Sequence, residues 1–214
     1  MDSVTQAVLG AAIGGAIAPT GQRRKALLVG AALGTLPDLD VVIDYGDAVA
    51  NFTYHRGFSH SLFVLPPFAL LLWLALRRWW APVRDAPLRW LAIIGLALIT
   101  HPLLDAHTAY GTQLLWPLDS PPVMWATLFI IDPLFTLPLL VAVVIAAAWP
   151  AGRSSQSLAR AGLLLSTLYL GWSWAAQSIV ARHAEDALTQ RGLSGAPVFI
   201  TPTPFNTLLW RVVV

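Results

Sequence analysis

The chain has 214 residues, of which 57% are hydrophobic and only 11% charged. Soluble domains usually carry about 25% charged residues, so this composition predicts a polytopic membrane protein. The formal net charge is +2. Basic residues are not grouped with interleaved aromatic residues, and nothing therefore indicates a nucleic-acid partner. The absence of cysteine excludes disulfides and thiolate metal ligands.

Six apolar segments are expected to form transmembrane helices, which makes the predicted fold an all-α membrane bundle. They cover about residues 4–18, 26–43, 61–76, 88–105, 123–149 and 161–181. The first two each contain a Gly-x-x-x-Gly spacing, at Gly10 and Gly14 and at Gly30 and Gly34. Such spacings let two helix backbones approach closely, so these two helices should form a tight hairpin.

Residues 182–214 differ from the transmembrane domain predicted for residues 1–181. Residues 182–190 have the polar character of a helix end, and residues 198–201 and 207–214 have the character of strands. The last apolar strand has no evident partner. We therefore expect a short extramembrane tail that begins a longer C-terminal domain.

The distribution of basic residues predicts the orientation. Nine of the 13 follow the first, third and fifth segments: Arg23, Arg24, Lys25, Arg77, Arg78, Arg84, Arg89, Arg153 and Arg160. The positive-inside rule places these nine in the cytoplasm and both termini outside. On this topology only Asp85 of the eleven acidic residues lies inside, and the other ten and all five histidines lie outside or near the outer membrane boundary. The titratable chemistry is thus expected to face the periplasm.

Three polar clusters interrupt the apolar sequence on the outer side. They occupy residues 37–40 (PDLD), 54–61 (YHRGFSHS) and 101–107 (HPLLDAH). Asp38 and His101 lie 13 and 12 residues from the nearest inner basic residue. That is a rise of only about 18–20 Å, against a hydrocarbon core of about 30 Å. The clusters should therefore line a cavity below the outer surface, where polar groups need partners.

Carboxylates and imidazoles together are typical ligands of hydrolytic divalent-metal sites. His101 and Asp105 are four residues apart, so they share one helix face. Asp38 and Asp40 can both reach an ion only where the chain is not helical, and Pro37, like Pro102, is expected to break its helix. We predict one or two ions of zinc, manganese or magnesium. The candidate ligands are Asp38, Asp40, His55, His60, His101, Asp105 and Asp132.

Several of these residues have plainer explanations. Aspartates after a proline often form turns, His101 and Asp105 can form an internal ion pair, and Asp132 before a proline is either a ligand or a helix N-cap. Arg56 either stabilises a developing anion or anchors the chain at lipid headgroups. His107 is expected next to the ligands, and His183 in a solvated tail.

Other hydrolase chemistries lack their motifs. Glu185 is the only glutamate, so no His-Glu-x-x-His sequence exists. Ser59 and Ser61 are not in a Gly-x-Ser-x-Gly elbow, and the chain has no Gly-x-x-x-x-Gly-Lys phosphate loop.

The combined motifs resemble a bacterial inner-membrane family of LexA-regulated, membrane-bound, metal-dependent hydrolases, the YdjM-like proteins. The matching pieces are residues 1–10 (MDSVTQAVLG), 37–40 (PDLD), 55–61 (HRGFSHS), 101–105 (HPLLD), 111–113 (GTQ) and 131–133 (IDP). The resemblance implies a polytopic hydrolase whose metal is carried by these aspartates and histidines. It also implies a longer C-terminal part in many members and a link to the DNA-damage response.

Our functional prediction is hydrolysis of an ester or phosphoester bond in a lipid or lipid-linked substrate at the outer face of the inner membrane. His60 and Asp105 are expected to act with the metal, and Arg56 to stabilise the anionic transition state. The alternative is a non-enzymatic sensor or carrier of divalent cations. A carrier would need a polar path to the cytoplasm, which the inner halves of the helices lack. A metal-free phosphatase would need a second basic cluster.

Overall fold

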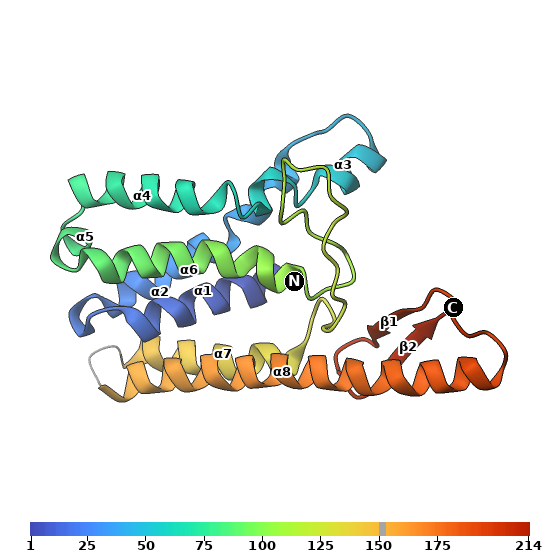
Figure 1. The fold of residues 1–214 in the computed structure, drawn as a ribbon. Coiled ribbons are helices and arrows are strands. Elements are labelled where there is room, and N and C mark those ends of the chain that lie inside the picture. The colour runs from blue at the N-terminus through green and yellow to red at the C-terminus, as the bar shows by residue number, and fades with distance from the viewer. Residues whose placement is uncertain (150–152) are drawn as a thin grey trace.

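The computed structural model describes residues 1–149 and 153–214. In this part, eight α-helices form a bundle that ends in a pair of strands (Figure 1). The helices are α1 (Ser3–Ile17), α2 (Arg23–Thr35), α3 (Ala48–Tyr54), α4 (Leu65–Trp79), α5 (Ala81–Asp85), α6 (Pro87–Asp105), α7 (Pro133–Ala148) and α8 (Arg153–Gln190). Short 3-10 turns are η1 (Thr20–Gln22), η2 (Pro37–Val42) and η3 (Phe58–His60). The strands are β1 (Phe199–Pro202) and β2 (Trp210–Val213).

Helices α1 and α2 form the most extensive contact in the bundle. A β-carbon on Gly10 would lie 2.0 Å from the carbonyl oxygen of Gly30, and one on Gly34 would lie 2.4 Å from that of Gln6. The two backbones are therefore in direct contact, which only glycine permits. The predicted tight hairpin is confirmed.

The long helices alternate in direction, so their ends gather at two poles (Figure 1). One pole, which we call the site pole, holds the start of α1, α4 and α7 and the end of α2 and α6. The opposite pole holds the start of α2, α6 and α8 and the end of α4, with Arg23, Arg24, Lys25, Arg77, Arg78, Arg84, Arg89 and Arg160 in or near these helix ends. The three polar motifs thus come together at one end of the bundle.

Several predicted boundaries were wrong for local reasons. Helix α2 ends at Thr35 rather than near residue 43, because Pro37 starts a 3-10 turn. Residues 123–132 are not helical, and α7 begins only at Pro133. Pro102 does not break its helix, since α6 continues to Asp105.

Residues 106–132 form a long connection across the site pole that hydropathy did not predict (Figure 1). Its backbone is tied to the end of α6, because the N–H of Trp125 donates to the carbonyl of Ala106 (2.7 Å) and that of Leu128 to His107 (2.9 Å). Thr112 and Val123 form an isolated antiparallel bridge. These bonds satisfy backbone groups that would otherwise be costly near lipid.

The C-terminal region is more regular than expected. Helix α8 runs through residue 181 to Gln190, so it crosses the predicted domain boundary without a break. Strand β2 pairs antiparallel with β1, with Phe199 opposite Val213. The expectation that the last strand lacks a partner was therefore wrong.

Among the described residues, α6 alone is both long and apolar enough to cross a membrane as a single helix. Residues Ala48–His60 and Leu65–Trp79 meet the same criterion together if this pair, bent by 54°, counts as one span. Helices α1 and α7 are apolar but shorter. The prediction of six spans therefore stays a prediction.

The glycine contact between α1 and α2 generates a stability test. We expect Gly10→Ala to destabilise the bundle by about 1–3 kcal/mol, as overpacking typically does. Gly95→Ala in α6 is the matched control, because nothing lies within 4 Å of its added β-carbon. Thermal unfolding in detergent should show a lower Tm for the first variant and an unchanged or higher Tm for the second. Equal Tm values would contradict the close approach.

A candidate metal centre at the site pole

Four side chains converge at the site pole. Asp38 comes from η2, His60 from η3, and His101 and Asp105 from the last turns of α6. One ligand atom from each lies within 4.8 Å of the others. The side chains of His60, His101 and Asp105 are fully buried, whereas that of Asp38 is 17% exposed. The cluster is therefore reached from the side of Asp38.

Five of the six distances between the four ligand atoms are close to those expected around a single ion. The two Nε2 atoms of His60 and His101 are 3.1 Å apart. Their distances to Asp38 Oδ1 are 3.4 and 3.3 Å, and to Asp105 Oδ2 they are 3.2 and 3.6 Å. Tetrahedral ligands about 2.0–2.1 Å from zinc lie about 3.3–3.4 Å from one another. In addition, the buried Asp105 Oδ2 accepts no hydrogen bond.

The proton positions on His101 follow from its partner. Its Nδ1 lies 2.5 Å from the carbonyl oxygen of Gly34. A carbonyl only accepts, so Nδ1 carries the hydrogen and Nε2 presents a lone pair to the cluster. This is the usual arrangement of a metal-binding imidazole.

A two-step relay orients His60 in the same way. The hydroxyl of Ser59 donates to Asp40 Oδ2 (2.5 Å), so its single hydrogen is used there. His60 Nδ1, 2.9 Å from Ser59 Oγ, must then donate. The Nε2 lone pairs of both histidines consequently face each other beside two carboxylate oxygens. Such an arrangement is repulsive unless a cation, either a metal ion or a proton, lies between them.

Asp105 is held by groups from three directions. The side-chain amide of Gln6 donates to its Oδ1 (3.0 Å) and also to the carbonyl of His101 (3.1 Å). The amino group of Met1 contacts the same Oδ1, and Arg56 Nε lies 3.2 Å from Oδ2. Position and charge of this carboxylate are therefore well defined.

Arg56 faces the cluster rather than the outer surface. Its side chain is only 4% exposed, and its guanidinium carbon lies 4.5 Å from the ring centre of Tyr110. The backbone has a positive φ of 64°, which is rare for a residue with a side chain. The guanidinium is therefore buried between Asp105 and Tyr110.

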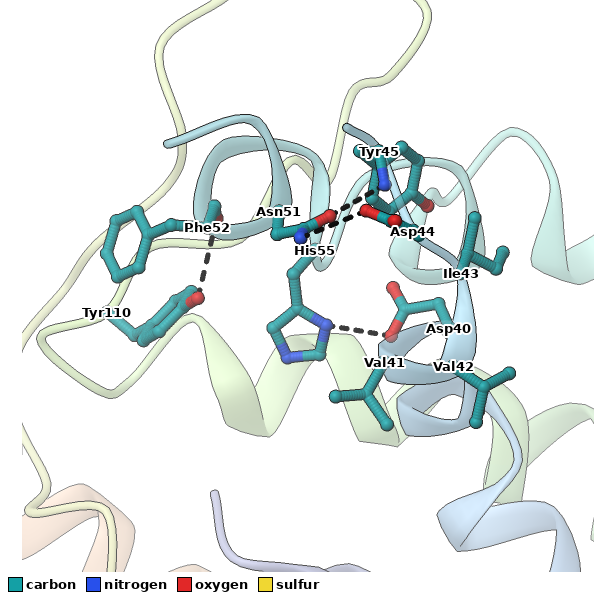
Figure 2. Close-up of a pocket in the computed structure, with 10 residues that line it drawn as sticks. All are labelled: Asp40, Val41, Val42, Ile43, Asp44, Tyr45, Asn51, Phe52, His55 and Tyr110. Carbon is teal, nitrogen blue, oxygen red and sulfur yellow. Dashed lines mark hydrogen bonds and ion pairs between the residues drawn. The ribbon is translucent and has the colours of Figure 1, made fainter. Parts of the chain in front are cut away.

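Of the predicted ligands, Asp40 and His55 lie next to the cluster of Asp38, His60, His101 and Asp105 but outside it. His55 Nδ1 is 2.8 Å from Asp40 Oδ1, while Oδ2 accepts from Ser59 and from the backbone N–H of Arg56 (3.0 Å). Both oxygens of Asp40 are therefore already engaged. Figure 2 shows this pair in the wall of a cavity, with the second nitrogen of His55 directed away from Asp40.

Asp132 is also outside the cluster, and of its two predicted roles it performs the capping one. Its Oδ1 accepts from the backbone N–H groups of Leu134 (3.0 Å) and Phe135 (3.3 Å), and its Oδ2 accepts from the hydroxyl of Tyr169 (3.0 Å). The proline at the next position favours this cap.

His107 and His183 bind their own helical turns. Nδ1 of His107 donates to the Leu103 carbonyl (2.8 Å), and its ring packs on Trp125 with centroids 4.6 Å apart. Burial lowers the pKa of His107, and the bond to Leu103 partly opposes that shift. The placement of His107 next to the ligands stays a prediction, whereas exposed His183 lies on α8 and contacts the Ile179 carbonyl.

Two contributors were missed in the sequence. Ser59 was considered only as a nucleophile, although its place between two motif histidines was a signal for a linking role. No sequence pattern indicates a role for Tyr169. It lies 37 residues after Asp132, and the two meet because α8 packs on α7.

The fold and the cluster define a helical bundle with a buried centre of two histidines and two carboxylates at one pole. The sequence profile of the YdjM inner membrane protein family matches residues 1–180, and the chain belongs to this family. It is therefore a protein of the bacterial inner membrane.

Two curated relatives support this membership. The chain is 30% identical over 181 residues to the uncharacterized protein YfhP of Bacillus subtilis, covering 79% of this chain and 51% of YfhP. It is 36% identical over 99 residues to the inner membrane protein YbcI of Escherichia coli, covering 44% of this chain and 54% of YbcI. The chain thus spans about half the length of the curated relatives it matches. No solved structure matches it.

The capping role of Asp132 is testable. We expect Asp132→Ala to lower the free energy of unfolding by about 0.5–2 kcal/mol, because α7 loses its N-cap. The metal content of the purified protein should stay at the wild-type level, since Asp132 is not a ligand. Thermal unfolding and elemental analysis of the same sample give both results. Loss of metal with an unchanged Tm would instead make Asp132 a ligand.

Proposed function

We propose that this chain is a metal-dependent hydrolase that cleaves an ester or phosphoester bond in a lipid or lipid-linked substrate. The proposal rests on one observation. The Nε2 atoms of His60 and His101 are 3.1 Å apart, point their lone pairs at each other and lie next to two carboxylate oxygens. A divalent cation neutralises this arrangement and is held by it.

The proposed ligands are Asp38, His60, His101 and Asp105, in a set of two nitrogens and two oxygens. Four ligands at this spacing suit one zinc ion better than magnesium, which prefers six oxygens; manganese is the next candidate. When bound, such an ion acidifies a water molecule and neutralises charge that develops on the substrate.

The chain's own residues would supply the rest of the chemistry. Arg56, 3.2 Å from Asp105, adds positive charge beside the reacting oxygen. In the net reaction, the hydroxyl of water joins the acyl or phosphoryl centre, and the proton leaves with the alcohol oxygen. The substrate would approach past Asp38, the one partly exposed ligand among the four.

We further propose that α1, α2, α4, α6, α7 and α8 all cross the inner membrane, with the site pole on the periplasmic side. Exposed aliphatic side chains on several helices support lipid contact, including Leu28 (72%), Leu71 (65%) and Leu168 (60%). The basic residues at the opposite pole support a cytoplasmic position for that pole.

A second candidate function is divalent-cation binding without catalysis, as in a sensor or carrier. Full burial of three of the four candidate ligands favours this alternative, because a closed site leaves little room for water and substrate. Activity of the whole protein is also part of the proposal, since the matched regions cover only 51% of YfhP and 54% of YbcI. The association with the DNA-damage response comes from the family resemblance alone.

Metal content is the decisive first measurement. The purified chain, supplemented with zinc, manganese or magnesium and then desalted, should retain about one ion per chain. The double variant His60→Ala, Asp105→Ala should retain almost none, while His183→Ala should match the wild type. If the wild type and the double variant are equally metal-free, the opposed imidazoles hold a proton instead and the proposal is lost.

Catalysis is then tested with phospholipids in mixed micelles. Release of a fatty acid or a headgroup that stops on chelation and returns with the metal would support the hydrolase. A metal-loaded chain that cleaves no ester or phosphoester in the panel would favour the cation-binding alternative.

Ser59→Ala tests the relay that orients His60. Without the hydroxyl, Nδ1 of His60 loses its partner and the ring can turn, so metal affinity should fall by about 10–100-fold. Ser59→Thr keeps the hydroxyl and should restore most of the affinity. Ser178→Ala, whose hydroxyl bonds only to its own helix, serves as a control. Unchanged affinity in Ser59→Ala would show that the relay does not position the ligand.

A further inference from the structure

Two cavities adjoin η2 and share lining residues from this segment. The first, which we call the polar cavity, has a volume of about 490 Å³ and is drawn in Figure 2. Its lining includes Asp40, Asp44, Tyr45, Phe52, His55 and Tyr110. The second, the apolar groove, has a volume of about 330 Å³ and lies between η2 and α4; its lining includes Leu39, Ser59, Val64, Leu65, Phe68 and Leu98.

The apolar groove has the chemistry of a hydrocarbon site. Among its described lining residues, only Asp40 and Ser59 are polar. Its rim residues Leu39 and Phe68 are 56% and 39% exposed. In an inner-membrane protein such exposed apolar side chains face lipid, so the groove continues the lipid-facing surface inward. The occupant that suits it is an acyl chain.

The polar cavity has the chemistry of a cation site. Its described lining contains carboxylates and the rings of Tyr45, Phe52 and Tyr110 but no lysine or arginine, although the guanidinium of Arg56 lies over the Tyr110 ring. The backbone N–H of Gly46 and the amide of Asn51 hold the pKa of Asp44 below its usual value, which keeps this carboxylate charged. The hydroxyl of Tyr45 is buried without a hydrogen-bond partner. Carboxylates with aromatic faces attract an ammonium group and disfavour an anion.

The two cavities meet at the edge of the metal centre. Both are lined by Asp40, Val42 and Ile43. Asp40 Oδ2 lies 3.8 Å from His60 Nδ1, so this residue separates both cavities from the cluster. If a molecule placed its apolar chain in one cavity and its polar end in the other, its central part would lie next to Asp40.

We infer that the chain binds a phospholipid-like amphiphile, with its acyl chain in the apolar groove and an amine-bearing headgroup in the polar cavity. Its assignment as the substrate rests on the proposed hydrolase function, whereas its binding is measurable without turnover.

The test uses phosphatidylethanolamine with a photoreactive diazirine in the acyl chain, added to the full chain in detergent. Cross-linked peptides identified by mass spectrometry should map to residues 36–43 and 58–68, and the labelling should saturate. Unlabelled phosphatidylethanolamine should compete about threefold better than phosphatidylglycerol with the same chains, the size expected for one ammonium contact.

Variants distinguish the contribution of the apolar groove from that of the polar cavity. Val64→Trp fills the groove and should lower labelling about tenfold, because several methylene groups lose their burial; Leu39→Trp is a second groove variant should the first fail to fold. Leu168→Trp, on the exposed face of α8, is the matched control and should leave labelling unchanged. Asp44→Asn should remove the preference for phosphatidylethanolamine, whereas Asp47→Asn, which is outside the cavity, should retain it.

Labelling spread evenly along the exposed faces of α4 and α8, and unaffected by both groove variants, would overturn the inference. So would equal competition by the two headgroups. Zinc content measured on the same samples keeps the two proposals apart. Bound zinc with uniform labelling would reject only the lipid site, and specific labelling without zinc would reject only the hydrolase.

Discussion

Two imidazole nitrogens that point their lone pairs at each other are the constraint around which the site pole is arranged. Each ring has its remaining nitrogen tied to a fixed acceptor: the Gly34 carbonyl for His101 and the Ser59 hydroxyl for His60. Neither ring can turn without breaking such a bond in a buried environment, where an unpaired polar group is costly. The site is thus preorganised by its outer partners as much as by the four candidate ligands.

The surrounding fold supports this arrangement by bringing helix ends from separate parts of the chain to one pole. The end of α6 supplies two candidate ligands from one face, while the irregular turns η2 and η3 supply one each. Regular helix positions hold His101 and Asp105 rigidly. The turns allow Asp38 and His60 to approach at angles that a helix would not permit.

Much of this arrangement was predictable from the sequence, and the limits have identifiable causes. The spacing of His101 and Asp105 specifies a shared helix face, and the paired glycine motifs specify a close hairpin, so both features follow from local geometry. Asp40 could not be distinguished from Asp38, because the difference depends on the distant Ser59 and Arg56 that engage it.

The remaining errors concern long-range packing. Residues 123–132 are apolar enough to be read as helix, yet their backbone is tied to the end of α6 and to the start of α1. The pairing of β1 with β2 and the bond between Tyr169 and Asp132 likewise join residues that no local pattern relates. Hydropathy predicts which residues are buried but does not identify such partners.

Gly34 takes part both in the packing of α1 on α2 and in the candidate metal centre. Its α-carbon meets the backbone of Gln6 at the helix crossing, while its carbonyl fixes the ring of His101; the side chain of Gln6 in turn holds Asp105. One residue pair therefore sets both the separation of two helices and the alignment of two candidate ligands. A bundle built in this way cannot loosen its first hairpin and keep a competent centre, so cation binding would report directly on whether the helices have assembled.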